Sequence, residues 1–367
     1  MEPVSTFART RVVALLIGAA LSTAGCATSP GQLDIYFVDV EGGQATLVVT
    51  PSRESLLIDA GYPGQGKSNP TPGDAEVARD AQRIAAAAAD ANVSRIDYLL
   101  VTHFHADHFG GVMELAQLMP VGTIIDHGTD SREARSNAKT LELIHEYKRT
   151  RDRNQYLVPT VGERLPLHEI EVTIVSSAGK ILKSPLKGAG AVNSACDRPI
   201  LIPSDKLENP RSTGVLVRYG NFRFLDLGDL AGQPLSDLVC PVNLIGNVDV
   251  YQVPHHGGAD AADPATFAAL RPRVAILNNG ATKGGHPSIF ELLRNAEDLE
   301  DVWQLHLSEN AGSENFPSEQ IANLGTQTSN WIRLRARRDG SFSIFNARTG
   351  AWKEFEAERT ELEENNR

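Results

Sequence analysis

The sequence predicts an α/β domain, because stretches with the residue pattern of strands alternate with stretches that have the pattern of helices. Residues 33–59 alternate in the manner of a three-stranded meander, with a turn at residues 41–43. An alanine-rich helix is predicted at residues 74–91, directly before a strand at residues 96–101. Later strands are predicted at residues 213–219, 222–227, 249–253 and 274–278.

Length and composition are compatible with a substantial core. The chain has 367 residues, of which 41% are hydrophobic and 22% are charged. At this size we expect one α/β domain of about 250 residues with small appendages. The formal net charge of −11 opposes binding of polyanions in general. Nucleic acid is therefore disfavoured as a partner, although a metal site could supply a positive field locally.

Residues 1–26 have the features of an export signal. Arg9 and Arg11 precede an apolar run at residues 12–21, and small residues follow that run. The apolar run is too short to serve as a permanent membrane anchor. We therefore expect the mature protein to work outside the cytoplasm.

Cys26 lies where a bacterial lipoprotein would be cleaved and lipidated. It follows Gly25 and resembles the cysteine of a lipobox, although Thr23 stands where leucine is usual. Ala27 in place of aspartate is similar to lipoproteins of the outer membrane. The expected location is thus periplasmic or, through a lipid anchor on Cys26, on the outer membrane. The alternative is that Cys26 only lies beside an ordinary cleavage site.

Two further cysteines, Cys196 and Cys240, remain after export. An oxidising compartment would permit a disulfide between them, and two cysteines admit only one pairing. The sequence does not show how closely their Cα atoms approach. A bridge and a pair of unpaired, partly buried thiols both stay open.

Four residues of metal-ligand type follow the predicted strand directly, namely His103, His105, Asp107 and His108. Imidazoles at positions i and i+2 fall on the same side of an extended segment, so His103 and His105 are predicted to converge on one ion. Asp107 and His108 lie past the bend and could hold a second ion. The alternative is that each side chain is merely solvated or hydrogen-bonded. So many ligand-type residues directly after a buried strand favour metal binding.

The stretch Thr-His-Phe-His-Ala-Asp-His at residues 102–108, after Leu-Leu-Ile-Asp-Ala-Gly at residues 56–61, resembles the metallo-β-lactamase superfamily. That superfamily has the signature His-x-His-x-Asp-His. The resemblance implies an αββα sandwich over residues 33–310, with two mixed β-sheets flanked by helices. Other segments are similar to the branch that contains the C-terminal domain of ComEC/Rec2 competence proteins and the phosphorylcholine esterases. These segments are residues 37–40, 227–230, 253–258 and 285–287.

The resemblance also implies roles for residues outside the histidine-rich loop. It makes Asp229 the carboxylate that bridges two ions, with Asp226 as the competing choice inside the strand. It makes His286 the last ligand of the second ion, where Pro287 could begin a helix. Asp59 is expected to brace the loop without binding metal.

Two adjacent histidines, His255 and His256, end a predicted strand. Adjacent residues at a strand end point in opposite directions, so one can bind metal while the other reaches the substrate. We assign His255 to metal and His256 to the transition state, with the exchange of roles left open. The predicted catalytic residues are thus His256 and Asp107. The predicted metal ligands are His103, His105, Asp107, His108, Asp229, His255 and His286.

Three further residues are candidates for supporting the site or contacting the substrate. His127 ends a predicted strand and is assigned to the pocket or to support of the loop, with metal binding as the alternative. An irregular insertion at residues 176–212 is predicted to lie over the metals and shape the pocket. It lacks the histidine that many relatives carry there. In it, Asn209 and Ser212 either contact the substrate or only form a turn.

The ligand set favours two Zn²⁺ ions, with Mn²⁺ or Fe also possible. The expected activity is hydrolysis by a metal-bound hydroxide, with a phosphodiester as the favoured substrate. A lactam, lactone or thioester is the alternative substrate. A non-catalytic surface lipoprotein with a residual metal site is a third hypothesis, and no protein partner can be inferred. The chain is expected to end in a β-hairpin appendage at residues 325–356 and a charged tail at residues 357–367.

Overall fold

The computed structural model describes Met1 and residues 31–67, 69, 71–129, 131–197 and 208–357. The expected export signal with Cys26, and the tail from residue 358 onward, lie outside the described residues. In the described part of the chain, no helix combines the length and the apolar character needed to cross a membrane.

The first β-sheet begins with the antiparallel meander of β1, β2 and β3 and continues with parallel strands through β4, β5 and β6. Its spatial order is β18, β17, β16, β1, β2, β3, β4, β5, β6. The strands are β1 (Leu33–Phe37), β2 (Thr46–Val49), β3 (Ser55–Ile58), β4 (Ile96–Leu100), β5 (Val121–Ile125), β6 (Gln155–Leu157), β16 (Ile332–Ala336), β17 (Phe342–Asn346) and β18 (Ala351–Phe355).

The second β-sheet is also mixed, with antiparallel strands at one end and parallel strands from β11 to β15. Its order is β15, β14, β13, β12, β11, β10, β8, β7, and β9 pairs with β8. The strands are β7 (Arg164–Leu165), β8 (Glu171–Ser177), β9 (Lys180–Ile181), β10 (Gly214–Tyr219), β11 (Phe222–Asp226), β12 (Val250–Gln252), β13 (Val274–Leu277), β14 (Asp301–His306) and β15 (Ile321–Asn323).

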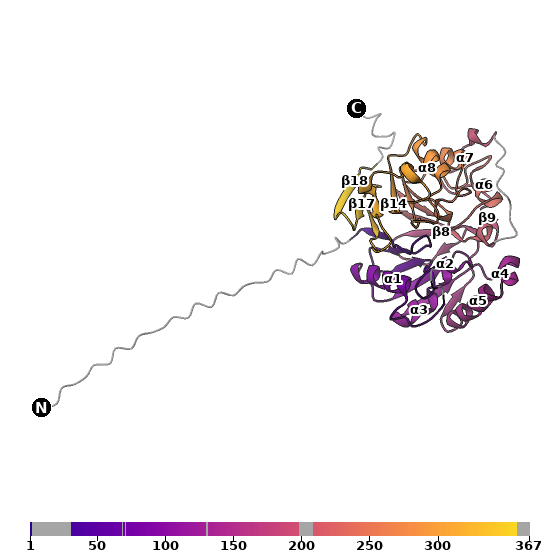
Figure 1. Ribbon diagram of the computed structural model, residues 1–367. Helices are drawn as coiled ribbons and strands as arrows, with labels where there is room; N and C mark the ends of the chain where they lie inside the picture. Colours follow the sequence, from indigo (N-terminus) through magenta and orange to yellow (C-terminus); the bar gives the residue numbers. More distant parts are fainter. Residues whose placement is uncertain (2–30, 68, 70, 130, 198–207, 358–367) are drawn as a thin grey trace. The chain divides into compact units, whose positions relative to one another are not determined.

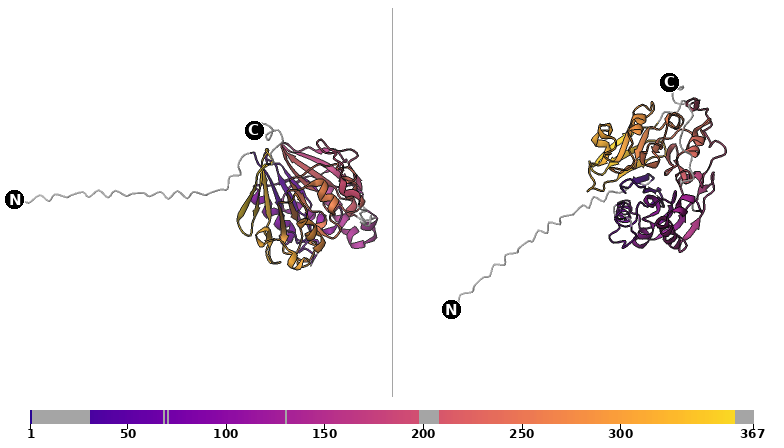
Figure 2. Two further views of the ribbon diagram at one scale, coloured as in Figure 1. Left: turned by 90° about the horizontal axis from the view of Figure 1, so that it is seen from above. Right: turned by 45° about the vertical axis from the view of Figure 1, so that its right-hand side comes forward.

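Helices cover the outer face of each sheet. Figure 1 shows α1, α3 and α5 on one side of the paired sheets and α6, α7 and α8 on the other. The two further views in Figure 2 show the same layers from other directions. This arrangement is the predicted αββα sandwich, which is confirmed. The helices are α1 (Arg79–Asp90), α2 (Ala106–Phe109), α3 (Val112–Leu118), α4 (Arg132–Ser136), α5 (Ala138–Arg151), α6 (Gln233–Val239), α7 (Pro264–Leu270) and α8 (Pro287–Arg294).

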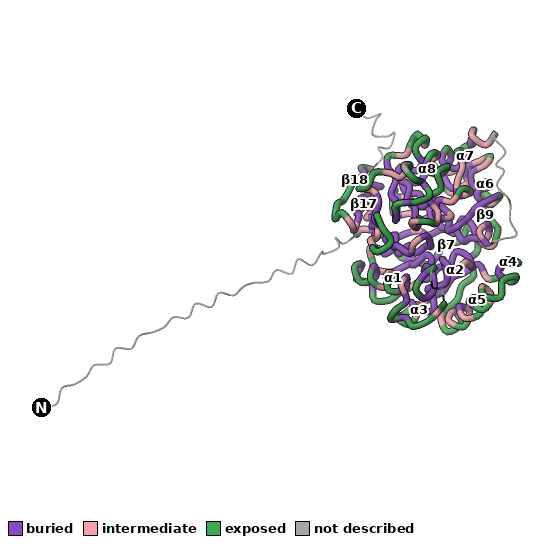
Figure 3. Tube along the Cα trace, in the orientation of Figure 1, coloured by how far each residue is buried: buried purple, intermediate pink, exposed green. Residues whose placement is uncertain are grey.

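Three apolar layers hold the sandwich together, one between the sheets and one beneath each set of helices. Between the sheets, the rings of Phe37 and Phe224 meet edge to face with centroids 5.6 Å apart. The strands nearest the centre are buried on both faces, as Figure 3 shows by their purple colour. Strands buried on both faces are rich in apolar residues. Residues 274–277 and 96–100 accordingly contain no exposed position.

One helix begins later than predicted, and the helical segment after β5 is divided in two. The helix predicted at residues 74–91 begins only at Arg79, because residues 74–77 form a turn. The charged helical segment that follows β5 is broken at Asn137 into α4 and α5. The Asn137 side chain accepts hydrogen bonds from the backbone of Lys139 and Thr140, so it caps the start of α5.

The C-terminal segment is part of the first sheet. Strand β16 pairs antiparallel with β1, placing Leu33 opposite Ala336, and β17 and β18 continue the sheet outward. The predicted hairpin appendage is therefore three strands that extend the sheet. Alternation of residues predicted strands here, but it carries no information on which distant strand they would join.

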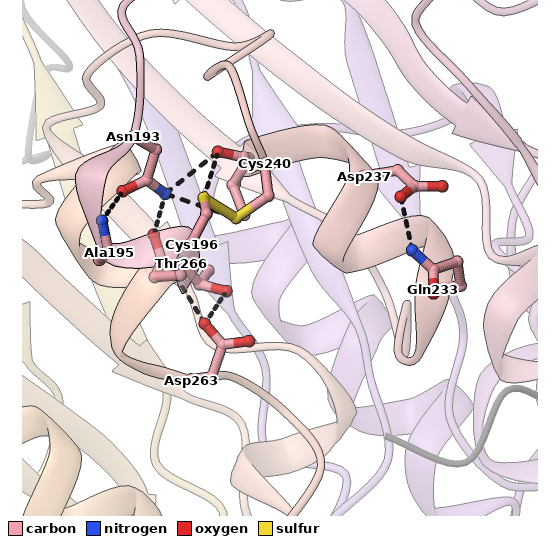
Figure 4. The surroundings of a disulfide bond; sticks show 10 residues. Asn193, Ala195, Cys196, Gln233, Asp237, Cys240, Asp263 and Thr266 are labelled. Carbon is pink, nitrogen blue, oxygen red and sulfur yellow. Dashed lines mark hydrogen bonds between the residues drawn. A yellow bond between two sulfur atoms is a disulfide. The ribbon is translucent and has the colours of Figure 1, made fainter. Parts of the chain in front are cut away.

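A disulfide joins Cys196 to Cys240 across 44 residues, with Cα atoms 5.8 Å apart. Cys196 lies in the short helix η1 (Ser194–Asp197), and Cys240 follows α6 directly. As Figure 4 shows, the Asn193 side chain lies beside the bridge and donates hydrogen bonds to Val239 and Ala265 carbonyls. The first part of the insertion is thus fixed to the second helical layer, whereas residues 198–207 lie outside the described residues.

Removing this bridge is expected to destabilise the domain. Closing a loop of this size restricts the unfolded chain and is worth up to about 4 kcal/mol in the chain-entropy account. We expect the double variant Cys196→Ser with Cys240→Ser to unfold at a lower urea concentration than the wild type. A reduced wild-type sample serves as the matched control and should behave like the double variant. An unchanged urea midpoint would contradict a stabilising role for the bridge.

Candidate metal centre

The loop after β4 is held in place by Asp59, which follows β3. Its carboxylate accepts hydrogen bonds from the backbone N–H and the hydroxyl of Thr102, both 2.7 Å long. The same carboxylate lies 2.7 Å from His108 Nδ1. Asp59 is completely buried, and burial raises its pKa. Asp59 therefore orients the loop from behind, and its carboxylate lies outside the ligand clusters described next.

The first cluster contains His103, His105 and Asp229. His103 Nε2 lies 2.9 Å from His105 Nδ1 and 3.9 Å from Asp229 Oδ2. The two histidines lie in the loop that follows β4, whereas Asp229 lies in the loop that follows β11 in the second sheet. Burial lowers the pKa of His103, which favours the neutral imidazole that binds metals.

The second cluster contains Asp107, His108, Asp229 and His256, all buried. His108 Nε2 lies 3.1 Å from Asp229 Oδ2 and 3.2 Å from Asp107 Oδ2. His256 Nε2 lies 3.2 Å from Asp107 Oδ2 and 3.3 Å from Asp229 Oδ2. Asp107 and His108 lie in the short helix α2, and the His108 ring packs against that of His103 with centroids 4.1 Å apart. Asp229 is shared by both clusters.

The charges of this centre are strongly coupled. Burial raises the pKa of Asp229, but His108 and His256 outweigh that effect and hold it well below its usual value. Burial lowers the pKa of His108, but the neighbouring carboxylates of Asp229, Asp107 and Asp59 raise it well above its usual value. The Asp229 carboxylate is therefore ionised and attracts positive charge into a buried space.

The donor set suits two divalent ions. Asp229 Oδ2 faces both clusters, and its other oxygen, Oδ1, is buried without a hydrogen-bond partner among the described residues. A buried carboxylate oxygen without a partner is costly, and a second cation would satisfy it. Imidazole and carboxylate ligands bind Zn²⁺, Mn²⁺ and Fe alike, so the cluster does not identify the metal.

The structure groups His256, and not the predicted ligand His255, with the other ligand-type residues. His256 lies in the second cluster, whereas the His255 side chain is 30% exposed and belongs to neither cluster. His255 Nδ1 lies 2.6 Å from Asp260 Oδ1, and its Nε2 lies 3.2 Å from Asn209 Nδ2. Both histidines have positive φ, 49° and 56°, in the short helix η3 (His255–Gly257). The alternation expected of an extended strand therefore does not hold at these two positions.

His286 does not act as a metal ligand in this arrangement. Its side chain is exposed and caps the start of α8, where Nδ1 accepts a hydrogen bond from the backbone of Ser288. The Ser288 hydroxyl lies 2.8 Å from the same nitrogen. The structure thus corrects the ligand predicted for this position, because an N-cap residue points along the helix rather than into the cluster.

The remaining predicted residues lie around the metal loop. His127 is buried behind it, with Nε2 2.9 Å from Glu208 Oε2, and belongs to neither cluster. Asn209, which begins the short helix η2 (Asn209–Arg211), contacts His255. Ser212 is buried, and its hydroxyl has no partner among the described residues. Contact between Ser212 and a substrate stays a prediction.

Two carboxylates that the sequence analysis did not single out support the loop. Glu208 is fully buried and accepts hydrogen bonds from the backbone of Phe104 and Ser131. Burial raises the pKa of Glu208, but its hydrogen bonds, that from His127 first, outweigh burial and lower it to about 2. Glu133 Oε2 lies 3.4 Å from His105 Nε2, so it can orient that ring through the nitrogen opposite Nδ1.

Two further residues lie on the solvent side of the second cluster, and sequence reasoning missed both. Lys283 contacts the Asp107 carboxylate, and its Nζ is 3.3 Å from the Tyr62 hydroxyl. Asp107 lies between this ammonium and the two cluster histidines. Burial raises the pKa of Asp107, but Lys283 and His108 hold it well below its usual value. The only available signal was the position of Lys283 in a glycine-rich stretch before His286.

One family model matches part of the chain. The metallo-beta-lactamase superfamily model matches residues 38–169, which include the loop from His103 to His108. No curated protein matches the chain.

Several solved structures are similar to this chain at low identity. The metallo-beta-lactamase fold protein YhfI from Bacillus subtilis is 12% identical, with a TM-score of 0.41, over 75% of this chain and 96% of that one. CmlA, a diiron beta-hydroxylase from Streptomyces venezuelae, is 16% identical with a TM-score of 0.39 over 75% of this chain. The match spans only 53% of the CmlA chain. MEM-A1, a subclass B3 metallo-beta-lactamase from a soil metagenome library, is 14% identical, with a TM-score of 0.33, over 75% and 77% of the two chains.

These structural likenesses are too distant to transfer an activity or a substrate to this chain. The match over residues 38–169 and the two stacked mixed sheets support the metallo-beta-lactamase superfamily, and the fold of this protein is the metallo-beta-lactamase fold.

Proposed function

We propose that this protein is a dinuclear metal-dependent hydrolase that acts on phosphodiesters. The observation that carries the proposal is the Asp229 carboxylate, which belongs to both ligand clusters and has its second oxygen unpartnered among the described residues. When bound, two divalent ions would activate a water for attack and polarise the bond to be cleaved. His103 and His105 would hold one ion, and Asp107, His108 and His256 would hold the other.

His255 is the proposed general acid. Asp260 holds its Nδ1, so Nε2, which contacts Asn209, is the nitrogen that would face the substrate from the partly exposed side of the centre. The Asp260 carboxylate, 2.6 Å from Nδ1, favours the protonated imidazole of His255. A protonated imidazole can transfer its Nε2 proton to the alkoxide that leaves when a phosphodiester is cleaved.

Asn209 supports this role of His255. Its amide nitrogen lies 3.2 Å from His255 Nε2, and its oxygen is buried without a partner among the described residues. The nitrogen and oxygen of an amide exchange places when the group is turned over. In that orientation the oxygen would accept the Nε2 proton, so Asn209 can hold the acid in position until the substrate replaces it.

The choice of a phosphodiester also draws on the resemblance of residues 253–258 and 285–287 to the ComEC/Rec2 and phosphorylcholine esterase branch. That resemblance covers the loop that carries His255 and His256. Because His286 caps a helix here, the resemblance at residues 285–287 supports the shape of the loop rather than a ligand.

The chain is further proposed to be exported and anchored through Cys26. The disulfide between Cys196 and Cys240 supports an oxidising compartment, since stable disulfides are rare in the cytosol of most organisms. The order of charged, apolar and small residues in the first 26 positions supports the same location.

Substrate preference can be tested with the purified, metal-loaded protein. We expect turnover of bis-p-nitrophenyl phosphate and little or no turnover of a nitrocefin-type lactam or a homoserine lactone. The physical reason is that two divalent ions would neutralise the negative charge of the phosphodiester and of its transition state. Turnover of the lactam or lactone alone would contradict the phosphodiester assignment. Stoichiometric metal without turnover of any substrate would instead favour a non-catalytic protein.

The exchange of the two histidines can be tested by substitution. We expect His256→Ala to lose metal, because it removes a ligand of the second cluster. His255→Ala should keep about two ions per chain and lose about 10²–10³-fold in kcat on a phosphodiester with an alkoxide leaving group, the usual effect of removing a positioned acid. Metal analysis and kcat are measured on the same samples. Metal loss in His255→Ala with full occupancy in His256→Ala would restore the original assignment.

Export can be tested in cells of a bacterium that processes lipoproteins. We expect Cys26→Ser to abolish labelling with a radioactive fatty acid and to move the protein from the membrane fraction to the soluble fraction. Lipidation requires the cysteine thiol, so serine at this position cannot replace it. Retention of the serine variant in the membrane fraction would argue for a different anchor.

A further inference from the structure

Lys283 is a cation placed beside the ligand centre by a built loop. It lies between β13 and α8, in the stretch from Gly280 to Gly285. The loop is closed by a hydrogen bond from Gly280 N–H to the Lys283 carbonyl, 2.9 Å long. A second bond, also 2.9 Å long, runs from Gly285 N–H to the His256 carbonyl. The loop is thus tied directly to the residue that holds the second cluster.

Glycines make room for this side chain. Gly42 has φ of +83°, and a Cβ on it would lie 2.8 Å from the Lys283 Cβ. Gly284 has φ of +71°, and a Cβ there would collide with the His256 backbone. Positive φ is readily adopted only by glycine, so both glycines are needed for this close packing. The stem of Lys283 is therefore fixed between two segments that also surround the metal ligands.

The ammonium at the end of this stem faces the second ligand cluster. It contacts the Asp107 carboxylate and lies 3.3 Å from the Tyr62 hydroxyl, with the side chain 26% exposed. The Tyr62 ring also lies beneath it, with 5.5 Å from Nζ to the ring centroid. The Lys283 ammonium has three N–H donors, and Asp107 alone does not accept all of them. The ammonium also remains open to solvent.

The charge balance of the centre indicates which kind of group the remaining N–H donor of Lys283 binds. Two divalent ions held by Asp107 and Asp229 would keep a net positive charge, and Lys283 adds one more. An ion at Asp107 would also weaken the hold of that carboxylate on Lys283, since both cations share the same oxygen. The ammonium is then available to an anion at the open side of the centre. A neutral ester or lactam would leave this charge without a partner.

We propose that Lys283 and Tyr62 form an anion subsite that binds a non-bridging oxygen of the substrate phosphate. This inference rests on the proposed phosphodiesterase function and names its substrate class as anionic. Lys283 donates to the phosphate oxygen from one side of the second cluster while His255 faces the leaving group from another. Tyr62 keeps the ammonium in place through its hydroxyl and its ring.

The test measures binding of inorganic phosphate to the metal-loaded protein by calorimetry, which does not depend on turnover. We expect Lys283→Met to weaken phosphate binding about 10–100-fold, the usual cost of a lost charge-assisted hydrogen bond. Lys283→Arg should lose less, because it keeps the charge. Lys180→Met, at an exposed position of β9, is the matched control and should bind phosphate like the wild type. All variants should keep about two ions per chain.

Three results would overturn the proposal. Lys283→Met could bind phosphate as tightly as the wild type, or it could lose metal, which would make Lys283 a structural partner of Asp107. Acetate could bind as tightly as phosphate with the same dependence on Lys283, which would assign the subsite to carboxylates. Should Lys283→Met not fold, Lys283→Gln removes the same charge. Phosphate binding that depends on Lys283 without turnover of bis-p-nitrophenyl phosphate would reject the activity and keep the subsite.

Discussion

The Asp59 carboxylate is the contact on which the rest of the site depends. It joins the end of β3 to the loop after β4 through Thr102, and it reaches His108 Nδ1 with the same oxygen that accepts from the Thr102 hydroxyl. Because the other ring nitrogen of His108 then points at Asp107 and Asp229, one buried carboxylate sets both the tautomer and the direction of a ligand. The rest of the centre is arranged around that fixed ring.

This constraint explains which parts of the site were predictable from sequence. His103, His105, Asp107 and His108 lie within one loop, so their spacing alone predicted two groups of ligands, and the structure brings both groups together with Asp229. The two mixed sheets and their helical layers also followed from alternating patterns and from the family resemblance. Local sequence carries this information because strand ends and the loops after them are set by neighbouring residues.

The remaining features depend on contacts that sequence spacing does not encode. His256 rather than His255 joins the second cluster, and both residues have positive φ, which no strand pattern predicts. Glu208 meets the backbone of Phe104 across 104 residues, and Lys283 meets Asp107 across 176. Such partners become visible only when the two sheets are stacked. The joining of β16 to β1 was unpredictable for the same reason.

The sign of the charge at the site has a consequence for recognition. The chain carries a formal net charge of −11, so an anionic substrate approaching from a distance meets repulsion rather than attraction. At physiological ionic strength, charges at the surface are screened beyond about 8 Å. The positive field of Lys283, and of ions bound at Asp107 and Asp229, would therefore act only near the opening. An anion that binds there is selected by direct contact with these groups, because long-range steering works against it.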